Sequence, residues 1–182
     1  MKHSTVKERE IQSFEKMKGA FHYKNSMAAP RLEKVVVNTG TGTAMKKDKN
    51  KNEAIALRLS KITGQKASLR GAKQSISSFK VRQGDPIGAM VTLRGKRMFA
   101  FLEKLINVAL PRTKDFRGIK RGAVDNIGNL TIGIKEHTIF PETADEDIRD
   151  VFGLSITLVS TAKTKAEGLA FFENLGVPFK KE

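Results

Sequence analysis

Cysteine and tryptophan are absent from this 182-residue chain, and tyrosine occurs once. Without cysteine the chain can form neither disulfide bonds nor zinc sites with thiolate ligands. With so few aromatic rings besides phenylalanine, stacking of single-stranded bases is not expected to be its main mode of nucleic-acid binding. No apolar run is long enough to cross a bilayer, and the opening MKHSTVKEREIQ has no apolar core of a signal peptide. We therefore expect a cytoplasmic protein without membrane contacts.

Acidic residues are scarce relative to basic ones. The chain has 34 Lys and Arg residues against 19 Asp and Glu residues, a formal net charge of +15. A field of that sign attracts a polyanion, either nucleic acid or an anionic membrane surface, and composition alone does not separate RNA from DNA. Because 39% of the residues are hydrophobic, a well-packed core is expected, and no linker divides the chain. We predict one domain over residues 1–182.

Residue patterns typical of enzymes are also few. His3, His22 and His137 have no nucleophile beside them. The segment NTGTG, residues 38–42, begins like a dinucleotide-binding loop, but Met45 stands where the third glycine is needed. A glycine-rich turn after a strand is the preferred interpretation. The segment RGKR, residues 94–97, lacks the remaining residues of a phosphate-binding P-loop. We predict no enzymatic activity, no cofactor and no metal site.

Capping residues and apolar spacing predict four helices. They cover approximately residues 5–21, 52–63, 96–110 and 164–175. Thr5 with Glu8, and Thr164 with Glu167, have the spacing of capping boxes. Pro111 is expected to end the third helix. The first helix is expected to bury an apolar stripe of Ile11, Phe14, Met17 and Phe21.

Alternating apolar residues predict about five strands between these helices. The predicted strands are residues 32–39, 66–70, 87–94, 129–136 and 153–161. This order favours an α+β fold in which a mostly antiparallel five-stranded sheet carries helices on one face. Alternation then places Lys34, Asn38, Thr92 and Arg94 on the opposite face. That face is polar and cationic, which suits either an RNA-binding surface or an ordinary solvated one.

Three charged clusters accompany the sheet. A basic finger loop, residues 71–85, is rich in Gly and Ser and carries Lys73, Lys80 and Arg82, with Arg70 just before it. Lys96 and Arg97 open a predicted helix, where free N–H groups and cations together favour phosphate. A second basic run contains Arg112, Lys114 and Arg117. The acidic segment 142–150 could hold a cation, remain a solvated loop, or contact a basic protein.

Several longer segments resemble one family. PRLEKVVVNTGTG, ITGQKASLRGAKQSISSFKVRQGDPIGAMVTLRG, PRTKDFRGI and IFPE are similar to the bacterial large-ribosomal-subunit protein five family, the 5S rRNA-binding proteins of the central protuberance. The resemblance extends over nearly the whole chain. The sequence departs from the family pattern at Thr39, Ile127 and Leu130, where Met, Arg and Tyr are common.

The resemblance implies a structural protein of the cytoplasmic ribosome. It implies that the polar sheet face binds 5S rRNA, with residues at the positions of Asn38, Gln65 and Thr92 as the recognition set, together with the outward-facing Lys34 and Arg94. It also implies that the finger contacts peptidyl-site tRNA. The residues expected at that contact are Arg70, Lys73, Gln74, Ser77, Lys80 and Arg82.

Further partners are expected from the same resemblance. Large-subunit rRNA is expected as a partner beside 5S rRNA. The residues expected to contact rRNA phosphates are Lys96, Arg97, Arg112, Lys114 and Arg117. Neighbouring 5S rRNA-binding proteins of the large subunit are expected beside the chain. A basic protein of the small-subunit head is expected to meet an inter-subunit bridge formed by Glu142, Asp145, Glu146 and Asp147. A free RNA chaperone or translational regulator with the same basic surface is the alternative function.

Overall fold

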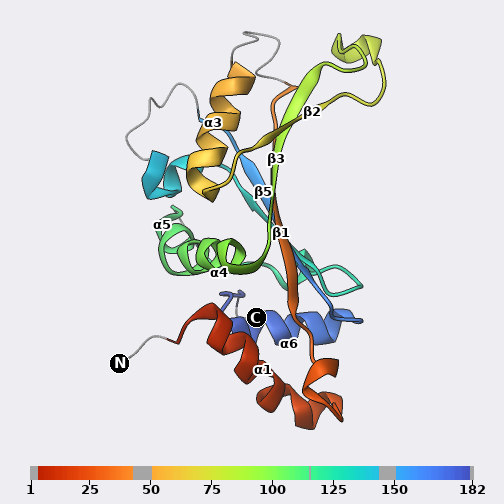
Figure 1. The fold of residues 1–182 in the computed structure, drawn as a ribbon, viewed down its shortest axis with the longest axis vertical. Helices are drawn as coiled ribbons and strands as arrows, with labels where there is room; N and C mark the ends of the chain where they lie inside the picture. The colour runs from red at the N-terminus through yellow and green to blue at the C-terminus, as the bar shows by residue number, and fades with distance from the viewer. Residues whose placement is uncertain (1–3, 43–50, 115, 144–150, 181–182) are drawn as a thin grey trace. The chain divides into compact units, whose positions relative to one another are not determined.

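The structure, a computed structural model, describes residues 4–42, 51–114, 116–143 and 151–180 (Figure 1). Its strands are β1 (Leu32–Gly40), β2 (Ser68–Gly71), β3 (Pro86–Leu93), β4 (Leu130–Ile134) and β5 (Leu154–Ser160). They form one five-stranded antiparallel sheet in the order β2-β3-β1-β5-β4. The predicted α+β fold with five strands is therefore confirmed, and each predicted strand lies within a few residues of its observed bounds.

The chain divides into two compact units, which are described separately. Unit 1 contains Met1–Val35, Arg94–Ile132 and Thr157–Glu182, and unit 2 contains Val36–Leu93 and Gly133–Ile156. Strands β1, β4 and β5 contribute residues to both units. The predicted single domain stays a prediction, which a single cooperative unfolding transition would support.

Burial alternates along the strands, as the sequence predicted. On β3, Ala89, Val91 and Leu93 are buried, while Met90 and Thr92 are half-buried. The buried residues of β4 and β5 likewise occupy every second position. On β1 the buried set is Leu32, Val35, Val37 and Thr39, and the alternation runs from Val35 onward. Burying a Val or Leu side chain contributes roughly 1.5–3 kcal/mol, so this alternation determines which face of the sheet stays open.

In unit 2, helix α3 (Lys51–Thr63) covers the buried side of β3. Its apolar residues Ile55, Leu59 and Ile62 are buried, at the spacing that places them on one side of a helix. Asn52 fastens the beginning of the helix, because its side-chain Nδ2 donates to the Pro86 carbonyl over 2.7 Å. Gly64 ends it with a left-handed backbone, φ +67°.

In unit 1, helix α1 (Val6–Phe21) begins with the predicted capping box. The Glu8 N–H donates to Thr5 Oγ1 over 3.3 Å, and the Thr5 N–H donates to Glu8 Oε2 over 2.9 Å. The predicted apolar stripe is wrong at Ile11, which is 67% exposed, whereas Met17 is buried and Phe14 and Phe21 are half-buried. Helix α1 packs against α6 (Lys165–Leu175), and the face that it buries is formed by Val6, Ser13 and Met17.

Helix α6 has only half of its predicted capping box. Thr164 Oγ1 accepts a hydrogen bond from the Glu167 N–H. The second bond of the box, from the Thr164 N–H to the Glu167 carboxylate, is not formed. The Glu167 carboxylate accepts hydrogen bonds from the Lys163 N–H and from the hydroxyl of Tyr23. Burial and this hydrogen bond raise the pKa of Tyr23 above its ordinary value.

The third predicted helix continues further than expected. Helix α4 (Gly95–Lys104) is followed by a π-helical turn (Leu105–Ala109) and by α5 (Leu110–Arg112). Pro111 does not end it, because proline occupies the first turn of α5, where its missing N–H is not needed. The helix ends one residue later, at Arg112. Among the described helices, none is both long enough and apolar enough to cross a bilayer.

Candidate RNA-binding surface

The open side of β1 and β3 carries the predicted recognition residues of unit 2. Asn38 on β1 is exposed, and Thr92 on β3 is half-buried. Gln65 lies after α3, and its Nε2 donates to the Thr92 carbonyl over 3.0 Å. This hydrogen bond joins residues far apart in the sequence, and it fixes the Gln65 amide next to Thr92. The three residues thus come from neighbouring strands and the segment that follows α3.

Thr39 occupies the opposite face from Asn38. Its side chain is buried, and Oγ1 donates to the Gly153 carbonyl over 2.7 Å. This bond explains how a hydroxyl is accommodated at a position where the resembled family commonly has Met. Of the two other departures, Leu130 is buried and Ile127 is 62% exposed.

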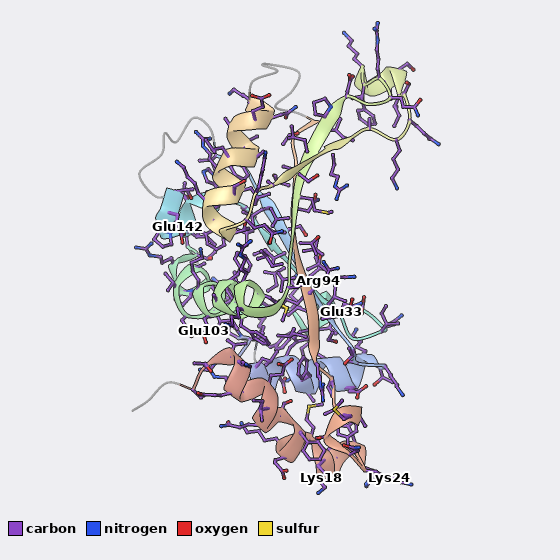
Figure 2. All side chains as sticks on the ribbon, viewed as in Figure 1. Lys18, Lys24, Glu33, Arg94, Glu103 and Glu142 are labelled. Atoms are coloured by element: carbon purple, nitrogen blue, oxygen red, sulfur yellow. The ribbon has the colours of Figure 1, made fainter. Side chains whose placement is uncertain are left out.

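Unit 1 carries the other predicted rRNA contacts. Lys34 lies half-buried on β1 and pairs with Glu33 over 3.4 Å from Nζ to Oε1. This pair is partly exposed, so it holds Lys34 only weakly. Arg94, labelled in Figure 2, is exposed and is the N-cap residue of α4, with no side-chain cap bond. The first turn of α4 therefore presents backbone N–H groups beside the exposed Lys96 and Arg97.

The second basic run is also accessible. Arg112 at the end of α5 is exposed, as are Lys114 and Arg117 in the loop that follows. A little further on, Arg121 Nη2 pairs with Glu173 Oε1 over 3.0 Å. The three predicted phosphate-contacting residues of this run thus lie on one accessible segment of unit 1.

The finger in unit 2 is a hydrogen-bonded hairpin that extends beyond the ends of β2 and β3 (Figure 1). At its base the Ala72 N–H donates to the Asp85 carbonyl, and the Gly84 N–H donates to the Ala72 carbonyl. A Cβ atom at Gly71 would lie 3.0 Å from the Gly84 carbonyl oxygen, so this close approach favours glycine. Further out, Ile76 and Val81 form a bridge.

Polar side chains hold the finger's bends. Asp85 Oδ2 accepts a hydrogen bond from the Arg82 N–H over 2.8 Å, and Ser75 Oγ accepts one from the Gln83 N–H over 2.9 Å. The predicted tRNA-contacting side chains are all exposed, and side chains ending in nitrogen radiate from the finger in Figure 2. They are Arg70, Lys73, Gln74, Ser77, Lys80 and Arg82.

Phe79 does not lie at the base of the finger. Phe79 lies in a short 3₁₀ turn (Ser77–Phe79) between Ile76 and Val81, and it is 59% exposed. The Ile76–Val81 bridge places this turn at the far end of the hairpin. Phe79 and Ile76 are therefore two apolar side chains among cations, which reasoning from the sequence did not identify as part of a site.

These side chains border a groove of about 930 Å³ that lies entirely within unit 2. The groove separates the finger from the ends of β1 and β3. Its lining includes Asn38, Gly40, Arg70, Phe79 and Gly88. The sequence signals that could have indicated it are an outward-facing glycine at position 40 and the apolar residues of the segment ISSF.

The acidic segment is only partly described. Glu142 is exposed on a short 3₁₀ turn (Pro141–Thr143), where Figure 2 labels it. Asp145, Glu146 and Asp147 lie outside the described residues. Nearby, His137 is buried, stacks on Phe152 with ring centroids 4.1 Å apart, and accepts the Phe152 N–H at Nδ1. His137 is therefore part of the packed interior of unit 2.

The arrangement of β1 argues against the dinucleotide-binding alternative. Such a site requires a parallel βαβ unit, whereas β1 lies between β3 and β5 in an antiparallel sheet. Among the described residues there is also no group of three or more His, Cys, Asp or Glu side chains that could hold a metal ion.

Comparisons with known proteins point to one family. Residues 25–82 match the model for ribosomal protein L5, and residues 86–179 match the model for the C-terminus of the same ribosomal protein family. Large ribosomal subunit protein uL5 of Trichlorobacter lovleyi is 50% identical over 91% of this chain and 92% of its own length. The protein of the same name from Nitratidesulfovibrio vulgaris is 52% identical over 88% of this chain and 89% of its own length.

Proposed function

The chain belongs to the uL5 family of ribosomal proteins, and from that premise we propose that it binds 5S rRNA through the open face of its sheet. As a family member it is a structural, non-enzymatic component of the large ribosomal subunit, located in the bacterial cytoplasm on the ribosome. The proposal concerns which RNA the chain holds and which residues hold it.

The observation that carries the proposal is the placement of Asn38, Gln65 and Thr92. Asn38 and Thr92 lie on the open side of strands whose other side is buried, and Gln65 lies beside Thr92. The Gln65–Thr92 hydrogen bond orders one of these side chains before RNA arrives, which lowers the entropic cost of binding. Amide and hydroxyl groups of this kind both donate and accept, so they can pair with base edges and 2′-hydroxyls of folded RNA.

We propose that cations of unit 1 supply the phosphate contacts. They include Lys34 and Arg94, and the N–H groups at the start of α4 add donors suited to phosphate. The exposed residues proposed to contact rRNA phosphates are Lys96, Arg97, Arg112, Lys114 and Arg117. The neighbouring 5S rRNA-binding proteins of the large subunit complete the proposed assembly.

The finger is proposed to contact peptidyl-site tRNA. Its support is the exposed row of cationic and polar side chains on a hairpin that extends beyond the sheet (Figure 1). The acidic group of Glu142, Asp145, Glu146 and Asp147 is proposed to bridge to a basic protein of the small-subunit head. Charge reversal at these four positions should loosen subunit association at low magnesium. Unchanged association together with impaired folding would contradict the bridge.

Substitutions on the open face test 5S rRNA binding. Asn38→Ala and Thr92→Ala should each weaken 5S rRNA binding by roughly 1–3 kcal/mol, because each leaves RNA polar groups unpaired in a buried interface. Binding is measured by filter retention or calorimetry at fixed salt. Thr138→Ala is the matched control, because Thr138 is half-buried but lies in the 3₁₀ turn His137–Ile139, outside the sheet.

A second measurement tests the phosphate contacts. Each neutralised phosphate releases counterions, so the logarithm of affinity should fall with the logarithm of salt by about 0.7–0.9 per contact. With roughly five contacts, binding should weaken by orders of magnitude between low and moderate salt. A flat plot, or loss of thermal stability without loss of affinity in the Asn38 and Thr92 variants, contradicts the proposed surface.

A further inference from the structure

Several positions that line the groove between the finger and the sheet have no side chain. Gly40, Gly42, Gly71 and Gly88 all line it. A Cβ atom added at Gly40 or Gly42 would meet no atom within 4 Å, so backbone is accessible there without steric cover. Its volume of about 930 Å³ lies in the range of sites that enclose a small molecule.

The walls of this groove combine three kinds of chemistry. Ile76 and Phe79, 46% and 59% exposed, supply apolar surface. Asn38 and Gln74 supply amides that both donate and accept hydrogen bonds. Arg70 and Lys73 supply positive charge, and none of the described lining residues is acidic.

A single unpaired nucleotide has groups that match the apolar, amide and cationic parts of the groove wall. Its base has a flat face that can stack on Phe79, and its edge has donors and acceptors for the amides. Its phosphate is an anion suited to an Arg and a Lys. A base within a duplex is excluded, because its faces are covered by the neighbouring base pairs.

We propose that this groove holds one unpaired nucleotide of 5S rRNA, with the base against Phe79 and the phosphate beside Arg70 and Lys73. The proposal rests on the function proposed above. It favours 5S rRNA over tRNA because Asn38, a residue of the proposed 5S rRNA-binding face, is itself part of the groove wall. The proposal moves Arg70, Lys73 and Gln74 from the proposed tRNA contact to 5S rRNA, while Lys80 and Arg82, which do not line the groove, are left for tRNA.

Filling the groove is the most direct test. Gly40→Leu places a side chain in it, and Gly40 has no left-handed backbone that would oppose the substitution. The matched control is Gly19→Leu on α1, an exposed position where an added Cβ also meets nothing within 4 Å. We expect Gly40→Leu to weaken 5S rRNA binding about ten- to a hundredfold, and Gly19→Leu to leave it unchanged.

A second variant separates stacking from simple filling. Phe79→Leu keeps an apolar side chain but removes the ring, and Phe79→Tyr keeps the ring. Each is combined with 5S rRNA that carries 2-aminopurine at one unpaired position at a time. We expect one position whose fluorescence is quenched by the wild-type protein and by Phe79→Tyr, but not by Phe79→Leu or Gly40→Leu. This comparison does not depend on Gly40→Leu folding, because Phe79 is an exposed residue of the finger.

The outcomes distinguish a failure of the groove proposal from a failure of the proposed function. If wild-type protein binds 5S rRNA, Asn38→Ala weakens it, and no 2-aminopurine position responds to Phe79→Leu, the groove proposal is wrong and the sheet proposal stands. Faster tRNA dissociation from Gly40→Leu ribosomes with unchanged 5S rRNA affinity assigns the groove to tRNA and also overturns the proposal. If wild-type protein does not bind 5S rRNA, the proposed function itself fails.

Discussion

The strands of unit 2 and the finger attached to them place their exposed residues by different physical means. On β3, Thr92 lies between Val91 and Leu93, which are 2% and 0% exposed. Burial of the neighbours determines which way Thr92 points. In the finger most side chains are exposed, and the backbone is held by hydrogen bonds through Asp85 and Ser75.

This difference determines which substitutions each region tolerates. An outward side chain on the strand can change without disturbing the fold, because its neighbours carry the packing energy. In the finger a side chain such as Asp85 has little packing to contribute, but its loss removes the acceptor for a backbone N–H. A strand therefore suits a permanent partner that needs fixed groups, and a hydrogen-bonded hairpin suits a contact that forms and breaks.

The largest expected effect comes from two adjacent residues on opposite faces of β3. Leu93→Ala should lower the free energy of unfolding by roughly 2–5 kcal/mol, because it leaves a cavity in the core. Thr92→Ala should lower it by no more than about 0.5 kcal/mol. Urea denaturation of both variants measures the difference. Equal destabilisation would show that alternating burial does not position Thr92.

The next effect concerns the side of the finger away from the groove. Lys80→Gln with Arg82→Gln should speed dissociation of peptidyl-site tRNA from ribosomes about two- to thirtyfold, since exposed charge contacts contribute roughly 0.2–1 kcal/mol each. The affinity for 5S rRNA should stay unchanged. Lys16→Gln with Lys18→Gln on α1 removes equal charge from exposed positions as the control. A collapse of 5S rRNA affinity with an unchanged tRNA off-rate would place this side of the finger in the rRNA anchor.

A smaller effect is expected from the hydrogen bond that closes the finger. Asp85→Ala removes the acceptor of the Arg82 N–H, so the Arg82 amide should exchange hydrogen about fivefold faster, equivalent to roughly 1 kcal/mol of local stability. The melting temperature of the whole protein should stay the same. Asp85→Asn keeps an oxygen acceptor and should exchange like the wild type. Loss of global stability in Asp85→Ala would mean that the finger is part of the core.

Local patterns in the sequence were sufficient for the strands and for their faces. Alternation with a period of two placed Asn38 and Thr92 outward, because β-branched and apolar neighbours leave one buried arrangement. The Thr5–Glu8 box was equally predictable, since both partners lie within one turn of helix. The resemblance to the family added Gln65, which no local pattern indicated.

Features that depend on contacts between residues far apart in the sequence could not be predicted from local patterns. Ile11 has the spacing of a core residue, but α6 packs on the face of Val6 and Met17 instead. Ser13 tolerates burial on that face because its Oγ donates to the Glu10 carbonyl over 2.6 Å. The groove is assembled from the segments around positions 40, 70–81 and 88, so only the folded hairpin reveals it.

The smallest expected effect tests a carboxylate–backbone bond in a less exposed setting than that of Asp85. Glu10 Oε1 accepts the N–H of Leu32, the first residue of β1, over 2.7 Å. Burial raises the pKa of Glu10 above its ordinary value of 4.5, although the Leu32 N–H and the nearby Arg31 and Lys7 lower it. A raised pKa means that the folded state binds the proton more tightly than the unfolded state. Stability from this group is therefore present below about pH 4.5 and is lost as pH rises through the folded pKa.

Glu10→Gln keeps an oxygen acceptor for Leu32 and removes the titration. The variant should therefore gain stability relative to wild type as pH rises from 4 to 7, by about a few tenths of a kcal/mol because the site is only partly buried. Denaturation at several pH values measures this difference, with Glu15→Gln, an exposed carboxyl on the same helix, as the control. A difference that stays constant with pH, or that matches the control, would show that the bond to Leu32 offsets burial and would contradict the prediction. A variant that instead loses stability relative to wild type as pH rises would show that the bond to Leu32 outweighs burial.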